Sequence, residues 1–190
     1  MTEKQKTVGL GSVYRIKVTL KGLKPPIWRR IEVSDRITLA KLHSVLQVVM
    51  GWTNSHLHHF RIGKTYYGEP DPDFGADTVN EKSVKLSQLL LREKRKFIYE
   101  YDFGDSWEHE ILIEKILPAS EGKKAPVCLK GSRACPPEDI GGVWGYAEFL
   151  EAVDDPQHPE HEDMMEWIGG QFDPEAFDLD EVNQYLKRIG

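Results

Sequence analysis

Apolar and polar residues alternate near the start of the chain, as they do in half-buried β-strands. The apolar positions of the first stretch are Tyr14, Ile16, Val18 and Leu20. This period of two predicts a strand, and a turn over residues 21–26 leads into a second predicted strand over 27–33. The pattern then changes to a helical spacing between Thr38, a suitable N-cap, and Gly51, a suitable stop. We therefore expect a strand hairpin followed by a helix.

A second hairpin is predicted near the middle of the chain. Phe97, Tyr99 and Tyr101 alternate on its first strand, and a turn over 103–106 joins it to an alternating second strand. The inward row of that second strand consists of Trp107, His109, Ile111 and Ile113. The turn brings Asp102 and Asp105 near His109, so the most reactive side chains of the hairpin gather at its joint.

The remaining pattern completes an α+β fold. A short helix is predicted over 84–91, a structured loop over 127–145, and three amphipathic helices around 146–153, 164–168 and 179–189. We expect residues 1–8 to form a flexible leader and residues 9–190 a single α+β domain. Its mainly antiparallel sheet begins with a hairpin and a helix, an order that β-grasp folds share, and its acidic C-terminal helical part starts at about residue 144 and packs on the sheet.

Composition and charge limit the expected location of the protein and its possible partners. The chain has 39% hydrophobic residues, no run as long as a membrane span and no apolar signal core, so we expect a cytoplasmic protein with no membrane partner. The net charge is −6, and residues 138–181 contain 15 carboxylates and no Lys or Arg. The rest of the chain has 25 basic side chains against 16 acidic ones. This segment either packs against a basic body or faces it, and a nucleic-acid partner is disfavoured.

The sequence points to a candidate site where the turn of the central hairpin meets the 128–144 loop. Its candidate residues are Asp102, Asp105, Trp107, His109, Glu138, Asp139 and Trp144. Trp52 and Tyr101 would add apolar walls to such a cleft, and a carboxylate could orient the imidazole of His109 as a base or a metal ligand. The alternative is that His109 is a core histidine with one satisfied hydrogen bond.

Ligands for a divalent transition metal are scattered over the chain. They are His56, His58, His109, Cys128, Cys135, His158 and His161, and no zinc-site spacing is matched. Solvated histidines and two buried small hydrophobic thiols are the competing explanation. Arg29 and Arg30 offer a further hypothesis, an anion-binding strand edge, against the alternative of two solvated arginines beside a surface tryptophan.

Several motifs in fixed order resemble one family over residues 10–187. They are Ile27–Arg30, the helix end over Leu42–Trp52, His56–His58, Tyr101–Asp105 with Trp107 and His109, Ala134–Asp139 with Gly141 and Gly142, Gly145–Tyr146, and Phe172–Glu175. Together they are similar to the Ri-plasmid ORF-three-like family, an uncharacterised family of which some members have been called resolvases or transposon passenger proteins. The resemblance implies an α+β domain in which the Tyr101–Asp105 and Ala134–Asp139 stretches share one architecture.

Three functions remain open at this point. The first is a binding or adaptor module that holds a ligand or protein partner in the cleft beside Asp102 and His109. The second is a metal-dependent hydrolase-like enzyme in which Glu138 or Asp139 serves as the base. The third is a DNA accessory protein of a mobile element, which would use Arg29, Arg30 and residues 92–96. Resolvase chemistry is disfavoured, because neither a nucleophilic serine among arginines nor a DNA-binding module is visible.

Overall fold

An eight-stranded sheet organises the computed structural model of the chain, which describes residues 11–70, 77–89, 91–119 and 126–189. The strands are β1 (Ser12–Leu20), β2 (Trp28–Ser34), β3 (His58–Ile62), β4 (Thr65–Gly68), β5 (Val79–Asn80), β6 (Lys96–Tyr101), β7 (Trp107–Pro118) and β8 (Val127–Ser132). Their order across the sheet is β5-β4-β3-β6-β7-β1-β2-β8. All neighbouring pairs are antiparallel except β4 and β5. The expected mainly antiparallel sheet and α+β class are confirmed.

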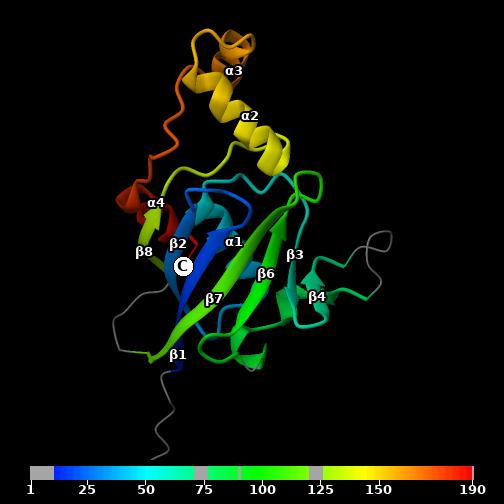
Figure 1. Cartoon of the computed structure of the whole chain (residues 1–190). Coiled ribbons are helices and arrows are strands. Elements are labelled where there is room, and N and C mark those ends of the chain that lie inside the picture. Colours follow the sequence, from blue (N-terminus) through cyan, green and yellow to red (C-terminus); the bar gives the residue numbers. More distant parts are fainter. Residues whose placement is uncertain (1–10, 71–76, 90, 120–125, 190) are drawn as a thin grey trace, which may run out of the picture.

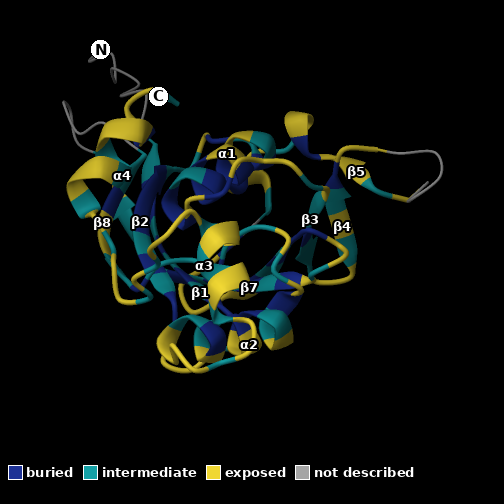
Figure 2. Cartoon of the chain, turned by 90° about the horizontal axis from the view of Figure 1, so that it is seen from above, coloured by how far each residue is buried: buried dark blue, intermediate teal, exposed yellow. Residues whose placement is uncertain are grey.

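Four helices surround this sheet. They are α1 (Leu39–Met50), α2 (Gly142–Asp154), α3 (His161–Ile168) and α4 (Leu179–Leu186). Figure 1 shows α2 and α3 beyond the end of the sheet where β6 joins β7, and α4 beside β8. In the view from above, α1 runs along one side of the sheet (Figure 2). None of the helices in the described ranges has the length and apolar composition needed to cross a bilayer.

The core lies between α1 and the sheet face that the period-two pattern predicts. Ile16 and Val18 of β1 are fully buried, as are Leu42 and Leu46 of α1. The side chain of Thr38 accepts a hydrogen bond from the N–H group of Lys41, as expected for an N-cap. Strand β1, strand β2 and α1 therefore follow one another as predicted.

The opposite sheet face is polar and carries ion pairs between strands. Arg15 lies 2.8 Å from Glu32, and Arg30 makes two hydrogen bonds to Glu114 at 2.7 and 2.8 Å. One packed face and one solvated face are typical of antiparallel sheets. The Arg15–Glu32 pair adds to the pairing of β1 with β2, whereas the Arg30–Glu114 pair spans β1 and connects β2 with β7.

Two predicted elements differ from the structure. The helix expected over 84–91 is replaced, in the described residues, by a short 3₁₀ turn over Leu86–Leu89, and a second such turn precedes it at Glu81–Ser83. The stretch 127–145, expected to be a loop throughout, begins with the edge strand β8 and ends in the first turn of α2. An edge strand tolerates glycine because it pairs on one side only. The flexible leader expected over residues 1–8 lies outside the described residues.

Candidate functional site

The turn between β6 and β7 is held in a fixed shape by its own carboxylates. Asp102 has a φ of 58°, and its Oδ1 accepts hydrogen bonds from the N–H groups of Gly104 at 2.9 Å and Asp105 at 3.3 Å. Asp105 Oδ2 in turn accepts a hydrogen bond from the N–H group of Gly141 at 3.1 Å. A Cβ atom at Gly142 would lie 2.6 Å from the carbonyl oxygen of Asp105, so this close approach requires glycine. The structure thus brings the hairpin turn into contact with the start of α2.

Three potential metal ligands converge beside this turn. His56 Nε2 lies 3.2 Å from Asp139 Oδ1 and 3.7 Å from Asp102 Oδ2. All three ligand atoms lie within 4.8 Å of one another. The Nε2 atom of His56 is buried and has no hydrogen-bond partner, although its ring is partly exposed. A buried imidazole nitrogen directed at two carboxylates has the chemistry of a cation site.

Glu138 connects the two loops that carry His56 and Asp139. Its carboxylate accepts hydrogen bonds from the N–H and hydroxyl groups of Thr53, at 3.1 and 2.5 Å, and from the hydroxyl group of Tyr101 at 2.6 Å. Burial raises the pKa of Glu138, but these hydrogen bonds outweigh it, and the net pKa is lowered. Glu138 is therefore an ionised acceptor that braces the site, with a proton affinity too low for an efficient base.

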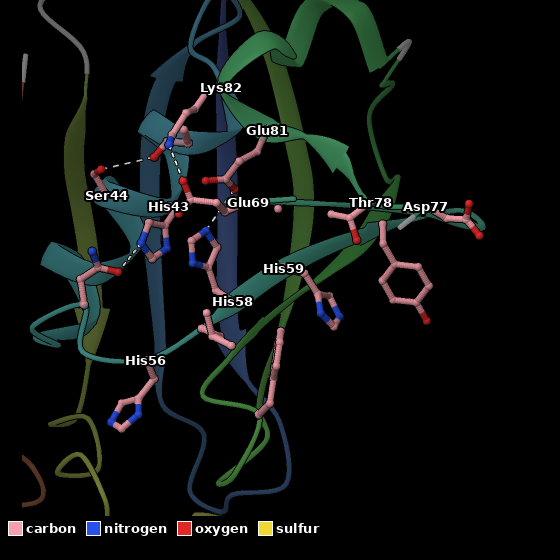
Figure 3. A pocket seen from close by; sticks show the side chains of 16 residues that line it. His43, Ser44, His56, His58, His59, Glu69, Asp77, Thr78, Glu81 and Lys82 are labelled. Carbon is pink, nitrogen blue, oxygen red and sulfur yellow. Dashed lines mark hydrogen bonds and ion pairs between the residues drawn. The ribbon is translucent and has the colours of Figure 1, made fainter. Parts of the chain in front are cut away.

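A cavity of about 760 Å³ opens next to His56 (Figure 3). Four histidines line it: His43, His56, His58 and His59. Its wall also contains carboxylates, Lys82, and the exposed rings of Tyr66 and Phe103. The cavity is thus lined by both polar and apolar side chains, and it borders directly on His56, one of the three converging ligands.

Two of the cavity histidines stack on one another. The ring centroids of His43 and His58 are 3.4 Å apart and their planes are parallel. His43 Nε2 lies 2.7 Å from Asn54 Oδ1, which only accepts, and His43 Nδ1 lies 2.7 Å from the hydroxyl group of Tyr99. Burial, together with the neighbouring His58, lowers the pKa of His43 to about 4. His43 is therefore neutral at neutral pH, with Nε2 as the donor.

His58 is bound to a carboxylate that the sequence analysis did not single out. His58 Nε2 lies 3.0 Å from Glu81 Oε2, and Glu81 is only 3% exposed. The two residues are 23 positions apart, and Glu81 lies in a turn that was expected to precede a helix. No local spacing connects them, because the contact depends on how the segment after β5 packs against β3.

His109, the centre of the predicted site, lies outside the cavity. It is fully buried, its Nδ1 is 3.3 Å from the carbonyl oxygen of Tyr99, and the edge of its ring meets Trp52. Burial lowers its pKa to about 4. Trp107 is also buried, whereas Trp144 is 82% exposed on α2 and lines a different groove. Of the predicted apolar walls, Trp52 and Tyr101 stack 5.0 Å apart beneath His56 and Glu138.

The remaining predicted metal ligands stay apart from this cluster. Burial raises the pKa of the Cys135 thiol to about 12 and also raises that of Cys128, which keeps both protonated. His161 Nδ1 lies 2.8 Å from the carbonyl oxygen of Ala152, and His158 Nδ1 accepts the N–H group of Glu160. Among the described residues, His56, Asp102 and Asp139 are the one group of three that converges.

The two arginines proposed for an anion site use their donors within the fold. Arg29 is 2% exposed and donates to carbonyl oxygens, including those of Val49 at 2.6 Å and Arg133 at 2.8 Å. Its guanidinium also stacks on Phe177 at 4.2 Å. The guanidinium of Arg30 is engaged by Glu114, as described above. Because backbone carbonyl oxygens occupy the donors of Arg29, an anion would have to displace them in order to bind.

Comparison with known proteins identifies the family. Residues 12–181 match the sequence model described as plasmid pRiA4b ORF-3-like protein. The chain belongs to this family. The match confirms the resemblance carried by the motifs between Ile27 and Glu175. It adds no reaction, because the two relatives described next are an uncharacterised protein and a protein of unknown function.

Two relatives illustrate how far the similarity extends. The uncharacterised protein y4hQ of Sinorhizobium fredii is 44% identical over 177 residues, which cover 92% of this chain and 91% of y4hQ. The crystal structure of MM3350 from Methanosarcina mazei Go1, a protein of unknown function, is 45% identical with a TM-score of 0.82. It covers 90% of this chain and 97% of MM3350. The fold described above is therefore shared with MM3350.

Proposed function

We propose that this protein is a binding module that holds a divalent transition-metal ion at His56, Asp102 and Asp139 and presents it to a ligand in the adjoining cavity. The observation that supports this function is the convergence of the three ligand atoms within 4.8 Å. They come from three separate segments of the chain: the loop after α1, the turn after β6, and the loop before α2.

The distances suit a metal ion. Two ligand atoms bonded to one ion at about 2.0–2.2 Å, with angles between about 90° and 110°, lie about 3 to 3.6 Å apart. The separations of His56 Nε2 from Asp139 and Asp102, 3.2 and 3.7 Å, are close to this range. One imidazole and two carboxylates suit manganese, iron or zinc, and three protein ligands leave positions for water or a ligand group. His56 also lines the cavity, so the proposed metal site borders it.

Binding is favoured over hydrolysis by the state of Glu138. A general base must have a free lone pair and a pKa near the working pH. Glu138 is occupied by Thr53 and Tyr101 and its pKa is lowered. The metal-dependent hydrolase alternative would therefore rely on Asp139, which the proposed site uses as a ligand.

The test is elemental analysis and calorimetric titration of protein purified without a histidine tag. We expect about one manganese, iron or zinc ion per chain. A chelator should lower the melting temperature by about 5 to 10 °C, which corresponds to an ion present at about 100 times its Kd. Asp139→Asn and His56→Ala should each weaken metal binding at least tenfold.

The control is His158→Ala, which removes a histidine outside the cluster and should leave the metal affinity unchanged. Equal affinity of the Asp139→Asn, His56→Ala and wild-type proteins would refute the proposed site. So would a metal-free protein that takes up none of these ions and does not shift its melting temperature. Circular dichroism of each variant separates loss of the ion from loss of the fold.

A further inference from the structure

The solvent-facing side of α2 carries an ordered row of side chains. Trp144, Glu148, Glu151 and Asp155 follow one another at spacings of four, three and four residues, and all are exposed. Such spacing places them on one side of a helix, with Asp155 as its C-cap. We call Glu148, Glu151 and Asp155 the acidic row. It begins one turn after Trp144 and continues to the end of the helix.

The acidic row has no counter-charge within the fold. In the described ranges, none of its three carboxylates forms an ion pair with a basic side chain. The surrounding segment 138–181 contains no Lys or Arg at all. The ion pair between Arg133 and Glu175 is the point at which a basic residue neutralises this segment in the described structure. Negative potential therefore accumulates over α2.

The position of the row is unfavourable for the helix itself. The C-terminal end of a helix carries the negative end of its dipole, so carboxylates there cost stability and basic residues would add to it. In α2 the first turn contains no acidic residue and the last turn contains no basic residue. This arrangement opposes helix stability, and it is explained if the carboxylates serve an external partner.

An apolar groove adjoins the N-terminal end of the row. It measures about 540 Å³, and most of its lining is apolar, including Leu23, Pro25, Ile27, Val143, Trp144 and Leu150. Two basic residues, Lys24 and Arg133, also line it, and Arg133 is paired with Glu175. Trp144 forms one wall and is 82% exposed. An exposed tryptophan next to a hollow of this size is typical of an anchor position in a protein interface.

We infer that α2 is a docking surface for a basic segment of a partner protein. One apolar side chain of that segment enters the groove beside Trp144, and its Lys or Arg side chains face the acidic row. Trp144 and Asp155 are eleven positions apart, which corresponds to about 16 Å along a helix. Charge complementarity identifies the partner's chemistry, because an anionic partner such as nucleic acid would be repelled. This surface is separate from the proposed metal site.

The test uses a fluorescently labelled synthetic amphipathic peptide with four lysines along one helical face and leucines along the other, together with a matched peptide in which glutamates replace the lysines. Anisotropy should show binding of the lysine peptide, weakened at higher salt, and none of the glutamate peptide. The double variant Glu148→Lys/Glu151→Lys should lose at least tenfold in affinity. Trp144→Ala should lose a similar factor with little change in salt dependence.

The matched control is Glu162→Lys/Glu166→Lys on α3, which makes the same change in net charge at two exposed positions. Its affinity should stay within about threefold of the wild type. Equal loss in both double variants would show general electrostatic attraction and overturn the docking surface. Absence of binding to the wild type would overturn it as well. A wild-type dimer that Trp144→Ala dissociates, seen by sedimentation, would show that a second copy of the chain occupies the groove instead.

Discussion

At the scale of single residues, the hydroxyl group of Tyr101 has two bonding roles. It donates to Glu138 at 2.6 Å and accepts the N–H group of Ser55 at 2.9 Å. Burial raises the pKa of Tyr101, and the hydrogen bond to Glu138 raises it further, so the hydroxyl keeps its proton. Because Ser55 precedes His56 and Glu138 precedes Asp139, this single oxygen links two segments that supply candidate ligands.

Tyr101→Phe removes that oxygen and keeps the ring. The carboxylate of Glu138 and the N–H group of Ser55 each lose a partner in a partly buried place, so the free energy of unfolding should fall by about 1 to 3 kcal/mol. Urea denaturation measures this change in the free energy of unfolding. The control is Tyr66→Phe, at a ring that is 45% exposed. A loss of the same size at Tyr66 would argue against a stabilising role for the hydrogen bonds of the Tyr101 hydroxyl group.

Buried histidines set the pH dependence of stability. The pKa of His43 and that of His109 are both lowered to about 4 by burial, whereas an unfolded histidine titrates near 6.5. Below pH 6.5 these two histidines are therefore protonated in the unfolded chain but remain neutral in the folded chain. The stabilisation is complete above pH 6.5 and is lost as the pH falls towards 4, by up to about 1.4 kcal/mol per pH unit for each histidine.

Urea denaturation between pH 4.5 and 6.5 measures this slope. The range lies above the ordinary pKa values of the carboxylates, and the groups facing His43 are His58 and Glu81. His43→Gln removes one titrating group and should reduce the slope of the unfolding free energy against pH by the contribution of about one proton. Above pH 7, His43 should contribute nothing to this slope. An unchanged slope in the variant would mean that His43 accepts its proton in the folded state.

At the scale of the elements, Arg29 joins pieces that are far apart in sequence. From the start of β2 it reaches the end of α1 through Val49, and the end of β8 through Ser132 and the following Arg133. Desolvation lowers its pKa, and within the described ranges no carboxylate hydrogen-bonds to it. Backbone carbonyl oxygens satisfy the charge in place of a counter-ion, which requires the fork of a guanidinium.

Arg29→Lys should therefore be strongly destabilising. A lysine has one nitrogen and cannot reach carbonyl oxygens on three elements, so several acceptors lose their partner beside a buried charge. We expect a loss of about 3 kcal/mol or more in the free energy of unfolding. Arg30→Lys provides the control, because its partly exposed pair with Glu114 should lose about 1 kcal/mol or less. Equal losses at the two positions would contradict the linking role.

At the scale of the whole molecule, the sequence predicts helices and strands better than it predicts the contacts between them. Alternation at Ile16 and Val18, and the caps at Thr38 and Gly51, are local signals, and the structure follows them. The site depends on contacts between distant segments. His109 was predicted from its place in a row of residues, but that row faces the core. His56 and Asp139 were both named, yet their convergence follows from a loop packing that no periodicity encodes.

The open edges of the sheet are managed differently at its two ends. β5 has only two residues, which leaves little edge to pair with another chain. At β8, the side chain of Asn183 from α4 imitates a neighbouring strand: its Oδ1 accepts the N–H group of Cys128, and its Nδ2 donates to the carbonyl oxygen of Cys128, both at 2.9 Å. A helix thus covers the last strand of the described sheet.

Asn183→Ala should uncover this edge. We expect a loss of about 1 to 3 kcal/mol in the free energy of unfolding and concentration-dependent association, measured by light scattering. Gln184→Ala, at the exposed neighbouring position, is the matched control and should change neither quantity. A monomeric and fully stable Asn183→Ala protein would show that α4 covers β8 by apolar packing alone.

The covering of β8 by α4 has a consequence for the nascent chain. Asn183 is synthesised about fifty residues after β8 is complete, a delay of roughly 3 to 10 s at ordinary translation rates. During that interval neighbouring nascent chains on one messenger could pair through the bare strand. The residues made in the meantime are those of the 138–181 segment, with its 15 carboxylates and no basic residue. Like charges on neighbouring chains repel one another, so this segment opposes association through the exposed edge before α4 is complete.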